Sequence, residues 1–367
     1  MAQVMGAVSI AVVLLTLGLA AANGANDVSK GVATLAGAGV ARYRTAILWG
    51  TGTTLIGALA SGVVAEHLSA LFSRGIVASP PTPAFALAVL MGAAGWVAFA
   101  TAMRLPVSTT HAIVGALIGA GVELAPGAVN WAVVLTNVAG PLLLSVAIAY
   151  LLSASLSWVR FGRAECVCVD IASPTPAIVP SGAAGAFASG LVLPVVTVTR
   201  GTSAECRIHA SGRVRVTVTT AHWFTSGATG LARGLNDRPK IVAIGAFALV
   251  PSGGDPRWLL GGVAVAMAFG GLVAGMRVAR SMAEKVVRMD HLEGFRANLT
   301  TALLVGVGAN LGLPMSTTHV ATGAIAGLAR KDASRLNRRT LRDFAVAWAV
   351  TPVCAGLISA IALRIVW

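Results

Sequence analysis

Two short hydroxyl-rich motifs recur in this 367-residue sequence, and each contains a proline. Residues 105–111 read Leu-Pro-Val-Ser-Thr-Thr-His, and residues 313–319 read Leu-Pro-Met-Ser-Thr-Thr-His. Because proline lacks a backbone donor and interrupts a preceding helix, each motif can begin a new helix. A helix N-terminus with several hydroxyls offers free N–H groups, a positive dipole end and O–H donors, which suit a small oxyanion. The candidate anion ligands are Ser108, Thr109, Thr110, Ser316, Thr317 and Thr318.

A charged motif precedes each hydroxyl motif. Residues 24–30 read Gly-Ala-Asn-Asp-Val-Ser-Lys, and residues 234–240 read Gly-Leu-Asn-Asp-Arg-Pro-Lys. Of the thirteen acidic residues, these two aspartates alone lie inside apolar segments away from a loop. A lysine follows each aspartate by three positions, and on a helix such residues share a face and can pair. The pairs are Asp27 with Lys30 and Asp237 with Lys240.

The charged motifs supply oxygens for a cation and ammonium groups for an anion. Carboxylate and amide oxygens suit Na⁺, and the adjacent Gly24 and Gly234 predict locally broken helix that frees further backbone groups. The candidate cation ligands are Asn26, Asp27, Asn236 and Asp237, the two aspartates being the expected Na⁺ ligands, and Lys30 and Lys240 join the anion ligands.

Simpler interpretations remain open for each group. The hydroxyls can bond to carbonyls of their own helix. The aspartate–lysine pairs can be purely structural, and the Lys30 side chain can extend to the membrane–water interface. His111 and His319, which end the hydroxyl motifs, can relay protons, although packed and hydrogen-bonded histidines are more common.

The two motif pairs indicate an internal duplication. The copies of the charged motif stand 210 positions apart, and the copies of the hydroxyl motif stand 208 positions apart, in the same order. Gly115 and Gly119 likewise align with Gly323 and Gly327. Many transporters are built from such repeats, with the substrate near the middle of the membrane at the repeat interface.

The composition indicates an all-α integral membrane protein. Hydrophobic residues make up 56% and charged residues 11% of the chain, and the mean hydropathy is +0.82. The net charge of +14 does not indicate nucleic-acid binding, because the basic residues fall in short loops between apolar elements. The ten expected elements are 4–22, 44–65, 84–103, 105–121, 128–158, 221–250, 258–279, 292–312, 313–329 and 343–366.

Loop charge predicts opposite orientations for the two halves, with broken or re-entrant elements at the midplane. Basic residues follow the first element of the first half but the second and fourth elements of the second half. The positive-inside rule then places both termini outside and the central loop in the cytoplasm of a multi-pass cell-membrane protein. The expected parts are 1–158, a first repeat; 159–220, a loop with some strand; and 221–367, an inverted second repeat.

The central loop carries cysteines at positions 166, 168 and 206. Their spacing matches no standard zinc pattern, so free cytoplasmic thiols are the simpler interpretation, and a metal or redox cluster is the alternative.

With Gly-Ala-Asn-Asp at 24–27, Gly-Leu-Asn-Asp at 234–237 and the paired Pro-x-Ser-Thr-Thr-His blocks, the sequence resembles the inorganic phosphate transporter (PiT) family over nearly the whole chain except the central loop. The resemblance implies inverted repeats and a symporter that couples phosphate to Na⁺ or H⁺; some relatives are sulfate permeases. It also implies that the hydroxyl motifs hold the anion and that the Asn-Asp pairs hold the coupling cation. Lys30 and Lys240 depart from it, since many sodium-coupled members have a small or neutral residue there.

The sequence therefore favours a cation-coupled phosphate permease in the lipid bilayer, with a sulfate permease and an anion channel as alternatives. No cofactor is expected besides the coupling ion, and a homodimer is left open. An enzyme acting on phosphorylated lipid is disfavoured, because a catalytic site needs one asymmetric set of roles, whereas these motifs are duplicated.

Overall fold

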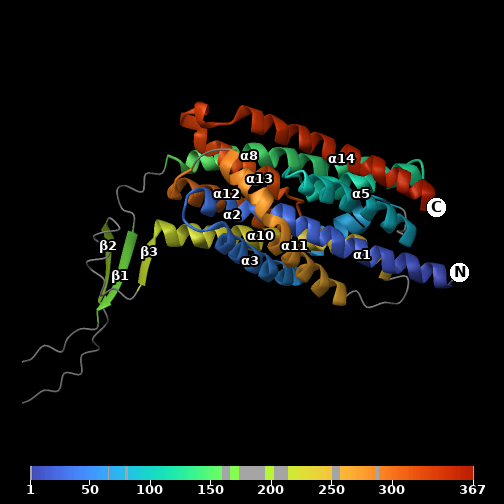
Figure 1. The fold of residues 1–367 in the computed structure, drawn as a ribbon, viewed down its shortest axis with the longest axis horizontal. Coiled ribbons are helices and arrows are strands. Elements are labelled where there is room, and N and C mark those ends of the chain that lie inside the picture. The colour runs from blue at the N-terminus through green and yellow to red at the C-terminus, as the bar shows by residue number, and fades with distance from the viewer. Residues whose placement is uncertain are drawn as a thin grey trace, which may run out of the picture. The chain divides into compact units, whose positions relative to one another are not determined.

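The computed structural model describes residues 2–64, 66–78, 82–158, 166–172, 195–201, 214–249, 257–285 and 289–366. It forms two units, one of Met1–Trp158 with His222–Trp367 and one of Val159–Ala221. The first unit is helical and carries every candidate site residue. Figure 1 shows its two chain ends at the same end of the helices.

The helices of the first half of the chain fall where apolar elements are expected. They are α1 (Ala2–Asp27), α2 (Ser29–Gly37), α3 (Tyr43–Val64), α4 (Glu66–Ala70) with a π-helical turn at Leu71–Gly75, α5 (Pro83–Ala102), α6 (Thr109–Leu124), and α7 (Trp131–Val133), which continues through the π-helical Val134–Ala139 into α8 (Gly140–Leu156). The short α2 was not expected from the sequence as a separate helix.

The second half follows the same order of elements. It comprises α10 (Val218–Leu249), α11 (Arg257–Lys285), α12 (His291–Asn310), α13 (Thr317–Leu328), two 3₁₀ turns at Ala329–Lys331 and Ala333–Arg335, and α14 (Arg338–Val366). Asp290 and Glu293 form a capping box that fixes the start of α12.

Among the described residues, five helical stretches are long and apolar enough to cross a bilayer. A sixth candidate is the pair Tyr43–Gly62 and Glu66–Gly75, whose two helices meet at 78°. The five stretches are Gly6–Gly37, Pro83–Ala102, Trp131–Leu156, Trp258–Ala283 and Arg338–Val366. These lengths confirm the prediction of an all-α membrane protein.

The chain interrupts its helices at the two hydroxyl motifs. Between α5 and α6, and again between α12 and α13, six residues lie outside helix. Arg104 (φ 62°) and Gly312 (φ 71°) take left-handed conformations at equivalent places in these connections. Ser108 and Ser316 then cap the new helices by accepting from the N–H groups three residues on. The prediction that each motif begins a helix is thus confirmed.

The charged motifs, by contrast, do not break their helices where the glycines predicted. The helix α10 runs unbroken past Gly234 and through Pro239, and the boundary between α1 and α2 is Val28 alone. Both glycines serve close packing, because a side chain at Gly24 would collide with the backbone of α11 and one at Gly234 with that of α3. The expectation of unwound helix at these glycines was therefore wrong.

The repeated glycines join each short helix to the opposite half of the chain. Gly115 and Gly119 bring α6 against the backbone of α14, whereas Gly323 and Gly327 bring α13 against the backbone of α8. Small residues at a four-residue spacing allow this approach in membranes. Each hydroxyl motif is thus held by the last helix of the other half.

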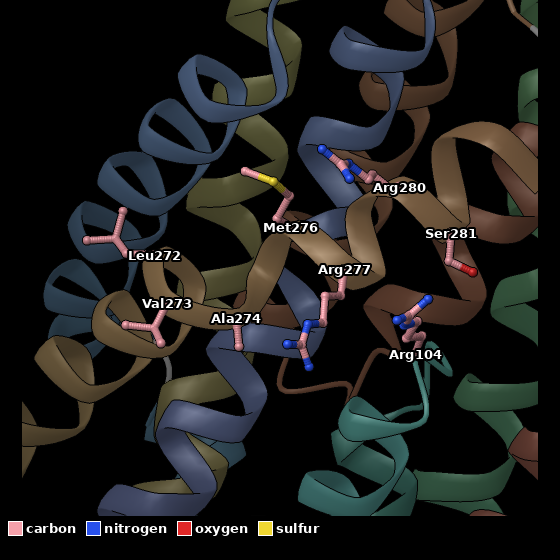
Figure 2. Close-up of a pocket in the computed structure, with 8 residues that line it drawn as sticks. All are labelled: Arg104, Leu272, Val273, Ala274, Met276, Arg277, Arg280 and Ser281. Carbon is pink, nitrogen blue, oxygen red and sulfur yellow. The ribbon is translucent and has the colours of Figure 1, made fainter.

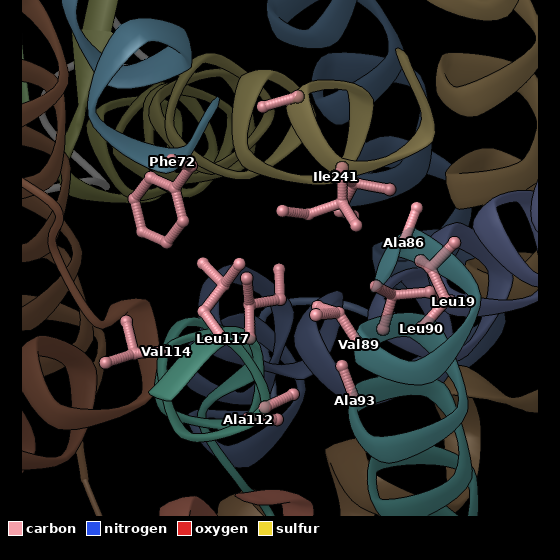
Figure 3. Packing of buried hydrophobic residues seen from close by; sticks show 14 of the residues in the cluster. Leu19, Phe72, Ala86, Val89, Leu90, Ala93, Ala112, Val114, Leu117 and Ile241 are labelled. Atoms are coloured by element: carbon pink, nitrogen blue, oxygen red, sulfur yellow. The ribbon is translucent and has the colours of Figure 1, made fainter. Parts of the chain in front are cut away.

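A hydrophobic core fills the space beside the first hydroxyl motif. Leu19 of α1, Leu90 of α5, Leu117 of α6 and Ile241 of α10 converge there, with Phe72 at one end (Figure 3). These residues come from both halves of the chain, so the core fixes the position of α6 relative to α1 and α10.

The glycine contacts yield a stability prediction. We expect Gly119→Ala to destabilise the protein by about 1–3 kcal/mol, because the added methyl group meets the α14 backbone around Gly356. Gly95→Ala is the matched control, since no atom lies within 4 Å of its Cβ position, and it should leave stability unchanged or raise it by up to about 1 kcal/mol. Thermal unfolding in detergent measures both; equal melting temperatures would contradict the packing role of Gly119.

The second unit is described as a three-stranded antiparallel sheet in the order β2-β1-β3. Its strands are β1 (Cys166–Ala172), β2 (Val195–Gly201) and β3 (Val214–Thr217). In its register Cys168 pairs with Thr199 on one side and Arg215 on the other. Cys206 lies outside the described residues, so the proposed three-cysteine cluster stays an untested alternative.

Candidate functional site

The twelve sequence-predicted residues are brought together at the centre of the helical unit. They lie on α1, α2 and α10 and at the starts of α6 and α13, and each is less than 5% exposed. Charged and hydroxyl groups so deeply buried among apolar helices are costly unless paired, which makes this centre the candidate functional site.

The first charged pair is short and is shared with the second hydroxyl motif. The ammonium of Lys30 lies 2.5 Å from Asp27 Oδ1. Thr317, from the other half of the chain, donates to Asp27 Oδ2 over 3.1 Å. Lys30 also donates to the side-chain and backbone oxygens of Asn26, both at 3.0 Å. The predicted ion pair is therefore present and is linked to α13.

The second charged pair is looser and is shared with the first hydroxyl motif. Lys240 Nζ lies 3.5 Å from Asp237 Oδ1, while it donates to Thr110 Oγ1 over 2.8 Å and to the Met315 carbonyl over 3.1 Å. Asn236 donates to Asp237 over 2.8 Å. Each lysine–aspartate pair thus contacts the hydroxyl motif of the opposite repeat.

Asn23 connects the two pairs. Its Nδ2 lies 3.4 Å from Asp27 Oδ2, 3.2 Å from Asp237 Oδ2 and 3.0 Å from Thr109 Oγ1. Its Oδ1, which is buried, has no hydrogen-bond partner among the described residues. An unpartnered acceptor beside two carboxylates can take a cation or a proton donor.

Asn26 and Asn236 hold the connections that precede the short helices. Asn26 donates to the Leu105 carbonyl over 2.9 Å and accepts from the Val107 N–H over 3.2 Å. Asn236 donates to the Met315 carbonyl over 2.9 Å and accepts from the Met315 N–H over 3.3 Å, so both of these bonds go to one residue. In this structure their amides satisfy backbone groups that the interrupted helices leave open, so they position the site.

The starts of α6 and α13 meet and exchange hydrogen bonds. Thr110 donates to the Met315 carbonyl over 3.3 Å, and Thr318 donates to the Val107 carbonyl over 2.8 Å. Ser108 and Ser316 are engaged as helix caps. The other two hydroxyls lie on the side of the carboxylates. Thr317 donates to Asp27 directly, and Thr109 is linked to the carboxylates through Asn23.

The two motif histidines are packed against each other. The rings of His111 and His319 stack with centroids 4.5 Å apart and planes 4° apart, and Trp348 covers His319 at 4.0 Å. Each Nδ1 lies within 2.8 Å of its capping serine hydroxyl. This geometry matches the packed role rather than the relay.

Sequence reasoning missed Arg233, the residue of α10 that precedes Gly234. The side chain is only 2% exposed; its Nε donates to Thr54 over 3.2 Å, and its Nη1 has no partner among the described residues. At an offset of 210 it is the repeat counterpart of Asn23, so the two halves differ here. The sequence signal for this residue is an arginine inside an apolar element, one position before the charged motif.

Arg233 makes the centre positive overall. Arg233 has electrostatic interactions with both carboxylates, Asp27 and Asp237, and with the Lys30 ammonium. Three cations, Arg233 and the two lysines, thus face two carboxylates, which leaves one formal positive charge in a buried place. Since an uncompensated buried charge is costly, an anion fits this centre.

No group of three or more His, Cys, Asp or Glu side chains that suits a metal ion occurs in the part of the chain that the structure describes. A bound Na⁺ would have to use Asp27, Asp237 and neutral oxygens such as Asn23 Oδ1, in the oxygen-only manner that this ion tolerates.

Five apolar spanning stretches around a buried charged centre make this chain a multi-pass integral membrane protein. Residues 23–359 match the model of the phosphate transporter family, and the chain belongs to that family.

Similar proteins span the same length. A Pyrococcus abyssi protein named as a phosphate permease is 27% identical, with 96% of each chain covered. A Rhizobium meliloti protein named as a low-affinity inorganic phosphate transporter is 28% identical over 92% of this chain and 90% of its own. A solved structure titled the sodium-dependent phosphate transporter has a TM-score of 0.69 at 21% identity, with 98% of each chain covered. The last likeness concerns the fold.

Proposed function

We propose that this protein is a cation-coupled symporter that carries inorganic phosphate across the cell membrane. The observation that carries the proposal is the excess positive charge at the buried meeting point of two helix N-termini, α6 and α13. Membership of the phosphate transporter family supports it, as do the names of the relatives and of the structural neighbour.

In this proposal the anion binds where the two repeats exchange contacts. Thr109, Thr317 and the neighbouring hydroxyls donate to its oxygens, and Lys30 and Lys240 turn from the aspartates toward it. Arg233 adds a guanidinium whose fork matches a tetrahedral oxyanion. Asp27 and Asp237, released by the lysines, take the coupling cation together with Asn23. Anion and cation binding are therefore linked through the same ion pairs.

The closed centre implies alternating access. We propose that the halves have opposite orientations, with both termini outside and the central loop cytoplasmic, so that the centre lies near the midplane. Access from either face then requires one hydroxyl motif to move, which breaks the bonds of Asn26 or Asn236 to the corresponding connection.

Phosphate and sulfate differ in protonation. Hydrogen phosphate can donate to a carboxylate, whereas sulfate only accepts, so an anion that contacts Asp27 or Asp237 should be phosphate. The lysines weaken this discrimination to the extent that they stay paired with the aspartates. The rates of sulfate and phosphate uptake are therefore to be compared, since their ratio measures this discrimination.

The coupling ion is Na⁺ or H⁺ in this proposal. The structural neighbour is titled sodium-dependent, which favours Na⁺. Lys30 and Lys240 instead place fixed charges near the anion, where a sodium ion would otherwise neutralise it, which favours H⁺.

The test is uptake of labelled phosphate and labelled sulfate by the purified protein in proteoliposomes, under separately imposed Na⁺ and H⁺ gradients. We expect phosphate to accumulate above equilibrium under one gradient and not the other, which also identifies the ion. Sulfate accumulation without phosphate would assign a sulfate permease, and gradient-independent equilibration would assign a channel. Absence of flux for both anions would overturn the proposal.

A further inference from the structure

A cavity of about 540 Å³ lies beside the buried centre and is lined with arginines. Figure 2 shows Arg277, Arg280 and Ser281 on α11 and Arg104 on the chain that leaves α5. The eight lining residues include no carboxylate, and none of the ion pairs between described side chains includes these arginines. Arg280 lies over the Tyr43 ring, 5.5 Å from its centroid. The cavity thus concentrates positive charge.

Two of the residues that line this cavity are chain neighbours of residues that contact the centre. Arg104 directly precedes Leu105, whose carbonyl accepts from Asn26. Ser281 directly precedes Met282, whose sulfur contacts the hydroxyl of Ser29, the neighbour of Lys30. The connection after α5, which would have to move if the centre opened, is therefore one wall of the cavity.

An equivalent cavity with much less charge lies at the other hydroxyl-motif connection, and residues of both halves line it. It measures about 570 Å³ and lies beside the connection after α12, where Gly312 is the repeat counterpart of Arg104 and has the same left-handed backbone. His67 and Arg74 are its basic lining residues. The two cavities occupy the same place in the two repeats, so their difference is a property of side chains and not of the fold.

We propose that the cavity lined by Arg104, Arg277 and Arg280 is a second oxyanion site, which holds inorganic phosphate between solution and the buried centre. This inference rests on the proposed function. Guanidinium groups bind phosphate in a fork geometry, and a cleft of one charge sign raises the local concentration of the opposite ion. Because its counterpart lacks this charge, the site makes the two faces unequal in their affinity for the anion.

The basic cavity also suits the phosphate of an anionic lipid headgroup, which has the same chemistry. The two sources differ in the role they give the arginines. A free anion makes them part of the transport path, whereas a lipid makes them an anchor whose effect depends on the composition of the bilayer.

The test is the double variant Arg104→Gly/Arg277→Gln. Glycine at position 104 removes a charge and keeps the left-handed turn, as Gly312 does in the other repeat. In proteoliposomes we expect the half-saturation for phosphate at one membrane face to rise roughly tenfold, with the maximal rate and the opposite face unchanged, and the salt dependence at the affected face to weaken. Arg339→Gln, which removes an exposed charge outside the cavity, is the matched control and should change neither face.

Vesicles of neutral phosphatidylcholine and vesicles with added phosphatidylglycerol separate the two sources. A one-sided change that persists in neutral vesicles supports the second phosphate site. A change confined to vesicles with anionic lipid would assign the cavity to a headgroup and overturn the inference. If the wild type transports phosphate and the double variant has the same half-saturation at both faces, the inference is also overturned. If the wild type itself takes up no phosphate, the proposed function is rejected instead.

Discussion

Asp27→Asn should reduce gradient-driven phosphate uptake by about 100-fold or more. The substitution removes the negative charge and replaces one carboxylate oxygen by an NH2 donor, so the buried Lys30 ammonium and the Thr317 hydroxyl are left with one acceptor oxygen between them. Breaking a buried ion pair costs about 3–5 kcal/mol of folding stability, which the melting temperature measures separately. In the proposed mechanism Asp27 also binds the coupling cation, and loss of one buried charged partner weakens binding by about 2–5 kcal/mol, where each 1.4 kcal/mol corresponds to about a factor of ten. Initial rates of uptake in proteoliposomes, normalised to the amount of folded protein, measure the effect.

The second pair provides an internal comparison. Both lysines keep two other acceptors, but Lys240 lies 3.5 Å from Asp237 whereas Lys30 lies 2.5 Å from Asp27. The looser pair contributes less, so Asp237→Asn should lower stability less than Asp27→Asn does. If the aspartates bind the coupling cation, both variants should nevertheless lose coupling.

A charge-neutral double variant separates stability from function. Asp27→Asn/Lys30→Gln removes both buried charges, so its melting temperature should recover toward that of the wild type while uptake stays low. Full uptake with normal ion dependence in Asp27→Asn and Asp237→Asn would instead show that the intramembrane acids are structural.

Arg233→Gln should raise the half-saturation for phosphate by about 30-fold or more. Arg233 is the cation at the centre that neither pairs with a carboxylate nor fills its hydrogen bonds among the described residues. Loss of one buried charged partner costs about 2–5 kcal/mol. Equilibrium binding of labelled phosphate to the purified protein measures the affinity independently of transport. Arg233→Lys keeps the charge but loses the fork of the guanidinium, so its affinity should lie between those of the wild type and Arg233→Gln.

Arg238 offers a matched control on the same helix. It is equally buried, but its guanidinium donates to the carbonyls of Leu260 and Ala58 and to Ser61. Arg238→Gln should therefore lower stability, while the protein that remains folded keeps its affinity for phosphate. An unchanged half-saturation in Arg233→Gln, or equal losses of affinity in the two variants, would show that Arg233 has no particular role in binding.

The sequence was sufficient to predict that the charged and hydroxyl motifs meet, but it did not predict that Arg233 joins them or how the residues share their hydrogen bonds. The duplicated motifs predicted that Asp27, Asp237 and both hydroxyl clusters belong together, because pattern and spacing repeat. The hydrogen bonds of Thr110 with Lys240 and of Thr317 with Asp27 each join the two halves of the chain. They could not be predicted, since they depend on how α6 and α13 pack on the opposite half.

The error at Gly234 has the same origin. A glycine beside an aspartate in an apolar segment has two physical uses, a break in the helix or a close approach between helices, and local sequence does not distinguish them. The backbone of α3 next to Gly234 decides the matter, and that neighbour is far away in the chain.

The attachment of α6 to α14 and of α13 to α8 constrains how such a protein can be divided. In a half-length chain with this arrangement, the short helix would lack the long helix against which it packs. It could be buried only by packing on a second copy of the chain, as in a domain-swapped dimer. Fusion of the two copies into one chain would then have freed each to diverge, as Asn23 and Arg233 have done.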